Sequence, residues 1–239
     1  MVDIEAYRKT WFAPATLDKS KLCDLSAKRL INPIYIRRWL IFIFLSIALY
    51  VSIYITASKL NWEHDENKKL TDHYYQSIFL VILGTFLFTL GNYNNTFSFL
   101  FPIGMIVGGF GIAYLGTLPG FNFSTNSLTK LSGVPLVTVI AISMILLFFA
   151  FQTYDRYRKC NMTPMFYTLF FLPVLVLFTG IIIASVENTN VHLHHWQWAL
   201  AFTLFARFPG KPLQSFLTGL FVGIVIDGIS RYGPDPMFN

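Results

Sequence analysis

The chain has 239 residues, of which 54% are hydrophobic and 18% aromatic, while only 13% are charged. Soluble domains carry about 25% charged residues, so this composition excludes a disordered chain and a disulfide scaffold. The composition also does not indicate a nucleic-acid-binding protein, although the formal net charge is +6. It predicts an all-α, polytopic membrane helix bundle whose partners are membrane lipids and other membrane proteins.

Seven apolar segments follow one another along the chain, and each is a candidate transmembrane helix. About 20 residues are needed to cross a hydrocarbon core about 30 Å thick. The segments are residues 39–58, 74–91, 96–118, 133–153, 165–185, 191–206 and 213–230. The sixth is the least regular, because it is long enough only if its His-rich beginning joins the helix. We therefore expect a cytosolic basic segment over 1–38 and a transmembrane helical domain over 39–239.

The distribution of basic residues predicts the orientation of these helices. With the N-terminus in the cytosol, thirteen of the 18 Lys and Arg residues fall on the cytosolic side, as the positive-inside rule requires. The C-terminus is then on the outer or lumenal side of a membrane that the sequence does not specify. All five histidines fall on that outer side as well, so any chemistry is expected there.

The densest group of side chains able to bind a metal is His192, His194 and His195. Imidazole is the commonest metal ligand near neutral pH, and residues three apart share one face of a helix. Asp227 and His73 are the predicted additional ligands, and Zn, Fe or Cu is the possible metal. One alternative is an interfacial loop whose histidines bond to backbone carbonyls and lipid headgroups. A heme or proton-coupled role is another.

Asp227 is the only charged residue inside a predicted span. An acid within the membrane is costly unless it is paired. Arg231, four residues later, can pair with it along the helix surface. His195 is the other predicted partner, because the short 209–212 turn makes the last two spans antiparallel neighbours. Both Asp227 and His195 are 16 residues from Lys211, which places them at the same depth.

Glycines recur at a spacing of four residues in two predicted spans. Gly104 and Gly108 lie in the third span, and Gly219 and Gly223 lie in the seventh. Small residues at this spacing let helix backbones approach closely in a membrane. The pattern predicts helix packing for all four glycines, with a ligand groove as the alternative.

Near the C-terminus, an HHW motif is followed by an apolar run, a Pro-Gly-Lys-Pro turn and the sequence GLFVGIVIDGISRYGPD. This pattern, within residues 154–237, resembles the C-terminal membrane region of the fungal LCCL-domain membrane proteins. The residues that match are His194, His195, Gly219, Gly223, Gly228, Arg231, Gly233 and Asp235. No Cys-rich LCCL domain lies between the first two spans, and Asp227 stands where the family has Asn. The resemblance implies a multi-span architecture and no particular activity.

Two functions from different classes are compatible with these features. The first is a scaffold or complex subunit that contacts lipids and partner proteins and needs no cofactor. The second is a metal-dependent membrane enzyme or binding protein that uses the outer-face His cluster on a lipid-like substrate. The sequence contains no GxSxG, P-loop or HExxH motif, and its HxHH spacing differs from the HxxHH of membrane desaturases. It favours the first function and leaves enzymatic activity open.

Overall fold

The computed structural model of the chain describes four α-helices and a few residues beside them. The structure describes residues 33–62, 68–90, 93, 97–117 and 212–233. It also describes the isolated positions 144, 151, 154–155, 157–158, 167, 199–200 and 202–203. The helices are α3 (Pro33–Lys59), α4 (Leu70–Leu90), α6 (Leu100–Leu115) and α10 (Pro212–Arg231). No strand occurs among these residues. For this part of the chain, the predicted all-helical fold class is confirmed.

These helices correspond to the first, second, third and seventh predicted spans. α3 and α4 each begin several residues before the predicted start, and α10 agrees with the prediction to within one residue at each end. α6 has 16 residues, or about 24 Å, and is shorter than predicted. Just before its first turn, the hydroxyl of Ser98 accepts a hydrogen bond from the N–H of Leu100 at 3.3 Å. The predicted spans 133–153, 165–185 and 191–206 lie almost wholly outside the described residues.

Local hydrogen bonds determine where α3 ends and α4 begins. Asn61 has a positive φ of 53°, and the N–H of Trp62 donates to the carbonyl of Ala57 at 2.9 Å. This is a Schellman motif with Asn at the left-handed position. At the start of α4, the Asp72 carboxylate accepts a hydrogen bond from the N–H of Lys69 at 2.8 Å, as in a capping box. α3 and α4 therefore form a helical hairpin.

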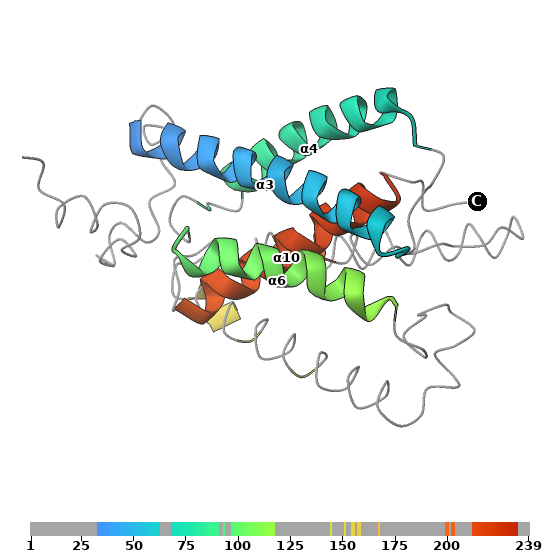
Figure 1. The fold of residues 1–239 in the computed structure, drawn as a ribbon. Helices are drawn as coiled ribbons and strands as arrows, with labels where there is room; N and C mark the ends of the chain where they lie inside the picture. Colours follow the sequence, from blue (N-terminus) through green and yellow to red (C-terminus); the bar gives the residue numbers. More distant parts are fainter. Residues whose placement is uncertain are drawn as a thin grey trace, which may run out of the picture.

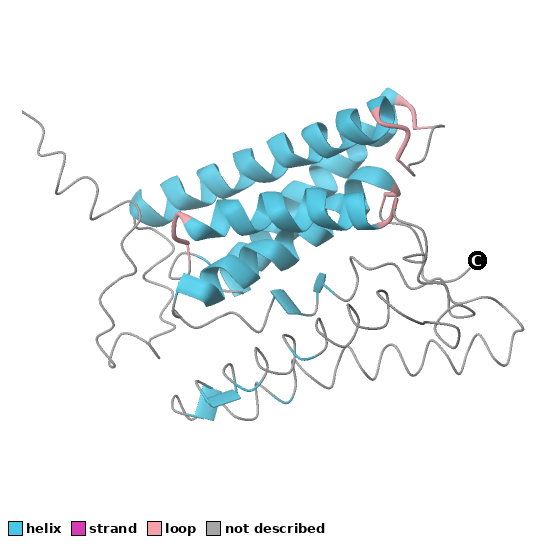
Figure 2. Ribbon diagram, turned by 60° about the horizontal axis from the view of Figure 1, so that its bottom comes forward, coloured by secondary structure: helices cyan, strands magenta, loops and turns pink. Residues whose placement is uncertain are grey.

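The four helices pack together into one bundle (Figures 1 and 2). α10 contacts α6, α3 and α4. It runs parallel to α6, because Ser98 before α6 hydrogen-bonds to Ser215 in the first turn of α10 at 2.7 Å. At the other end of the pair, a Cβ on Gly116 would lie 4.0 Å from the Arg231 guanidinium.

α3 is parallel to α6 and α10, and α4 is antiparallel to all three. Ser230 at the end of α10 donates to the backbone carbonyl of Tyr50 in the second half of α3 at 2.8 Å. Tyr35, near the start of α3, hydrogen-bonds to Thr89, near the end of α4, at 3.0 Å. Three helices thus end at one end of the bundle, where α4 begins. We call it the Lys68 end, and the opposite one the Ser98 end.

A cluster of aromatic rings fills the bundle at the Ser98 end. Neighbouring rings have centroids 5.1 to 6.2 Å apart, a range in which tilted and edge-to-face contacts are favourable. The members are Phe42, Phe88, Tyr93, Phe97 and Phe101. Tyr93 has no exposed surface, and its hydroxyl donates to the carbonyl of Thr203 at 3.2 Å. Thr203 is thereby joined to the core.

Large apolar side chains lie on the outside of the bundle as well as in its core, and several polar side chains are buried in the interior. The exposed large apolar side chains of α3 are Ile34, Ile36, Leu40, Phe44, Val51 and Ile55. Those of α4 are Leu70, Tyr74, Tyr75, Ile78, Ile82 and Phe86. Those of α6 are Ile103, Ile106, Val107 and Tyr114. The buried polar side chains of the helices are Ser46, Gln76, Gln214, Ser215, Thr218, Asp227, Ser230 and Arg231. The core is mostly apolar, as in a soluble protein, but so many large apolar side chains on the surface are unusual for one.

Two of the described helices, α3 and α10, are long and apolar enough to cross a membrane. Their length and composition by themselves do not separate a membrane span from the core helix of a soluble protein. α10 in particular is mostly covered by its neighbours. The apolar surface of the bundle and the ion pair buried inside it are therefore the more informative observations.

Candidate functional site

The backbones of α6 and α10 touch where glycines replace side chains. A Cβ atom on Gly104 would overlap the carbonyl oxygen of Phe216, and one on Gly108 would overlap that of Leu220. No flexible side chain could move away to relieve these overlaps, because the obstacle is the backbone of the facing helix. Both positions on α6 therefore require glycine at this separation of the helices.

The same arrangement occurs from the other side of the interface. A Cβ on Gly219 would overlap the carbonyl oxygen of Phe101, and one on Gly223 would overlap that of Met105. The four glycines for which helix packing was predicted thus lie in one contact between two parallel helices. Each glycine on one helix faces a backbone carbonyl of the other, which is the geometry that small-xxx-small steps permit.

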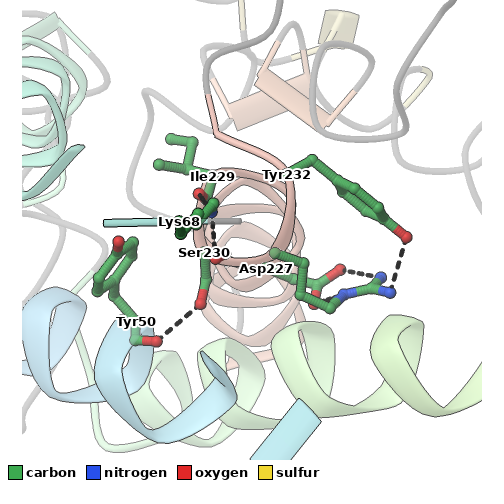
Figure 3. A network of polar contacts seen from close by, with 7 residues as sticks. Tyr50, Lys68, Asp227, Ile229, Ser230 and Tyr232 are labelled. Atoms are coloured by element: carbon green, nitrogen blue, oxygen red, sulfur yellow. Dashed lines mark hydrogen bonds and ion pairs between the residues drawn. The ribbon is translucent and has the colours of Figure 1, made fainter. Parts of the chain in front are cut away.

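Asp227 and Arg231 form a buried ion pair on α10. The Nε atom of Arg231 donates to Oδ1 of Asp227 at 2.7 Å, and Nη2 donates to Oδ2 at 2.8 Å. The two side chains are 0% and 3% exposed. Bidentate, charge-assisted bonds of this kind are stronger than neutral ones. Nη1 of Arg231 also donates to the hydroxyl of Tyr232 at 2.9 Å, as seen in Figure 3.

Lys68 caps the end of α10. Its Nζ atom donates to the carbonyl of Ser230 at 2.7 Å and to that of Ile229 at 3.4 Å, and Figure 3 shows its ammonium group beside these carbonyls. The last carbonyls of a helix have no partner within the helix and attract positive charge. Nζ also donates to Oε1 of Gln76 at 3.1 Å. Lys68 therefore connects α10 to α4.

Tyr50 and His73 complete this polar network at the Lys68 end. The Tyr50 hydroxyl donates its proton to Oε1 of Gln76 at 2.7 Å and lies 2.8 Å from Nδ1 of His73. Since a phenol has one proton to give, Nδ1 must donate to the Tyr50 oxygen. Neutral His73 is therefore the Nδ1–H tautomer. Burial lowers the pKa of His73 below its usual value and the positive charge of Lys68 lowers it further, whereas Asp72 opposes these effects.

The predicted metal ligands do not form a site within the described residues. His192, His194 and His195 lie outside them, so the predicted pairing of His195 with Asp227 stays a prediction. His73 bonds to Tyr50, and the Asp227 carboxylate is held by Arg231. No group of three His, Cys, Asp or Glu side chains that could hold a metal occurs in the described part of the chain.

Sequence reasoning missed four members of the network. They are Tyr50, Lys68, Gln76 and Ser230. A signal was available for two of them, because Tyr50 and Gln76 are polar residues near the same predicted end of two neighbouring spans and need partners in a membrane. Nothing in the local sequence points to Lys68 as the cap of a helix 162 residues away.

Comparisons with known proteins do not place this chain in a family. No family model matches the chain, and neither a curated protein nor a solved structure matches it. The resemblance to the fungal LCCL-domain membrane proteins stays a prediction that depends on the motif residues alone.

Proposed function

We propose that this chain is a multi-pass integral membrane protein that acts as a scaffold or as a subunit of a membrane complex. The observation that carries the proposal is the apolar surface of the bundle together with a charged pair buried inside it. Phe44 on α3 and Ile82 on α4 are 71% and 65% exposed, whereas Asp227 and Arg231 are 0% and 3% exposed. Lipid chains satisfy the apolar exterior, and bonds within and between the helices satisfy the polar side chains buried in the core.

The directions of the helices support an odd number of crossings between α6 and α10. If α6 and α10 both span the membrane in the same direction, the chain between them must return from the Lys68 side to the Ser98 side. Residues 118–211 must then cross the membrane once or three times. Three crossings correspond to the predicted spans 133–153, 165–185 and 191–206 and give seven in total.

The orientation in this proposal has the N-terminus in the cytosol and the C-terminus outside. The Ser98 end is then cytosolic and the Lys68 end is outer or lumenal. Arg37 and Arg38, at the beginning of α3, lie on the cytosolic side, where basic residues are enriched. Anionic lipids of the cytosolic leaflet are suitable partners for these two side chains.

Labelling of cysteines in sealed vesicles tests this topology. We expect an impermeant maleimide to modify the two native cysteines, Cys23 and Cys160, from the cytosolic side alone. Cysteines introduced by Thr117→Cys or Lys130→Cys are expected to react from the outer side alone. Permeabilised vesicles, in which all four positions should react, provide the control. Modification of Cys160 from outside would contradict the seven-span arrangement.

Copurification in a mild detergent tests the scaffold role. A specific membrane partner recovered at constant stoichiometry would support a complex subunit. The competing outcome is a protein that purifies alone with stoichiometric Zn, Fe or Cu, lost in the His194→Ala and His195→Ala variants. Elemental analysis of the same sample separates these outcomes.

A further inference from the structure

The outward-facing surface of α3 is apolar over a limited height. Between the flanking charges of Arg38 and Lys59, its exposed large apolar side chains run from Leu40 to Ile55. These two residues are 15 positions apart, which corresponds to about 23 Å along the helix. A bilayer that covers this surface needs a hydrocarbon core at least about 23 Å thick.

The surface of α6 gives the same height independently. Its exposed large apolar side chains run from Phe99, directly before the helix, to Tyr114. They are also 15 positions apart, or about 23 Å. The helix itself has 16 residues, and the backbone groups at its ends have no partner that lipid could supply. α6 is therefore too short to cross a much thicker core.

The third surface, on α4, sets an upper limit. The carboxylate of Asp72 accepts a hydrogen bond from the N–H of Lys69 in the first turn of this helix. Its side chain is short, so it cannot reach along the helix to water as the long side chains of lysine and arginine do. The helix ends at Leu90, 18 positions after Asp72, or about 27 Å away. A thicker core would enclose the carboxylate or the last backbone carbonyls of α4.

We propose that the bundle is matched to a thin bilayer of the endoplasmic-reticulum type, with a hydrocarbon core about 23–27 Å thick. The core of the endoplasmic reticulum is about 27 Å thick, whereas that of the sterol-rich plasma membrane is about 32–33 Å thick. Tilt of the helices lowers every height given above and so favours the thinner membrane further. The inference rests on the proposed multi-pass architecture and adds the kind of membrane that surrounds it.

The described helices differ in how well they tolerate a thicker membrane. α3 tolerates it best, because Arg38 and Lys59 can extend their charged groups toward water while their stems stay in lipid. α4 and α6 have no such reserve, since Asp72 is short and α6 has 16 residues. In a core about 5 Å too thick, the lipid around these two helices must thin or the helices must shift, at a cost for each ångström.

Reconstitution of the full chain into phosphatidylcholine vesicles of graded chain length tests the match. The vesicles cover hydrocarbon cores from about 22 to about 34 Å. The readout is the fraction of unfolded chain, measured as sensitivity to protease at raised temperature. We expect this fraction to be smallest at a core of about 23–27 Å and to rise roughly tenfold in the thickest vesicles.

Two double variants show whether the ends of α4 and α6 set the optimum. Asp72→Leu/Thr117→Leu extends the apolar surface of both helices at the Lys68 end, so the optimum should move to vesicles about 4 Å thicker. Asp72→Asn/Thr117→Asn changes the same positions without adding apolar surface and is the matched control, with the optimum of the wild type. Loss of the Asp72 bond to Lys69 weakens the protein in every vesicle and does not move the optimum.

The outcomes separate this inference from the proposed function. An optimum at about 30 Å or above, or a stability that does not depend on thickness, would overturn the match to a thin membrane and leave the multi-pass architecture standing. A chain that is not retained by any of the vesicles would contradict both. An optimum that stays in place in Asp72→Leu/Thr117→Leu would show that these helix ends do not set it. If that variant does not fold, the series with the wild type decides alone.

Discussion

The two helix pairs of the bundle are held together in different ways. Between α6 and α10, glycines face backbone carbonyls, and a single added methyl group has no space at Gly104, Gly108, Gly219 or Gly223. Between α3 and α4, large side chains fill the contact and bond across it, as Trp39 does by donating its Nε1–H to the hydroxyl of Thr85 at 3.1 Å.

With the bundle in a membrane, as proposed above, this difference follows from what lipid offers to the helices. Lipid is as apolar as leucine, so burial of apolar side chains between helices is weakly driven, and close packing and hydrogen bonds must supply the association. The α6–α10 pair relies on close backbone packing. This packing is possible only if no residue at the contact has a side chain that keeps the two backbones apart. The α3–α4 pair relies on several separate side-chain contacts. Single substitutions should therefore damage the first pair far more than the second.

The largest effect is expected from breaking the buried ion pair on α10. In Arg231→Met, the Asp227 carboxylate stays in a buried position without its cationic partner. Removal of one partner of a buried pair costs about 3–5 kcal/mol, whereas its replacement by apolar residues is often close to neutral. We expect the double variant Asp227→Leu/Arg231→Met to be more stable than Arg231→Met alone. Unfolding in mixed detergent micelles measures both, with Lys59→Met, at an exposed lysine, as the control.

The same measurements identify the partner of Asp227. In a double-mutant cycle, residues in direct contact show coupling energies of about 0.5–3 kcal/mol, whereas distant residues give additive effects. The bidentate geometry predicts strong coupling between Asp227→Ala and Arg231→Ala. Strong coupling between Asp227→Ala and His195→Ala would indicate that the Asp227 carboxylate bonds to His195 as well as to Arg231. Additivity with His195→Ala would remove His195 from the pair.

The next effect in size is expected at the glycine contact. In Gly108→Ala, the new methyl group overlaps the carbonyl oxygen of Leu220, so α6 and α10 must separate. Overpacking of this kind costs about 1–3 kcal/mol. Gly111→Ala on the same helix is the matched control, because nothing lies within 4 Å of a Cβ there. The control should be neutral or stabilise α6 by up to about 1 kcal/mol through helix propensity. Equal destabilisation by both variants in thermal unfolding would contradict the close contact.

The sequence could predict those features that depend on local pattern. Apolar windows locate α3, α4 and α10, and a spacing of four residues is enough to suggest the Asp227–Arg231 pair. The same windows make α6 too long, because hydropathy averaged over a window does not locate the residue at which a helix begins or ends. The contact of Lys68 with Ser230 could not be predicted, since it depends on how helices far apart in the chain pack against one another.

The smallest effect is expected where α3 and α4 bond through single side chains. In Thr85→Val, the acceptor of the Trp39 N–H is lost, together with the bond of the Thr85 hydroxyl to the carbonyl of Val81 at 2.7 Å. Hydrogen bonds between membrane helices contribute about 0.6 kcal/mol on average, and we expect a loss of that size. Thr218→Val is the matched control, because it removes a bond of the same kind, to the carbonyl of Gln214 at 2.7 Å. If Thr85→Val destabilised the protein as much as Gly108→Ala, side-chain bonds would matter as much as backbone contact, and the contrast between the two helix pairs would not hold.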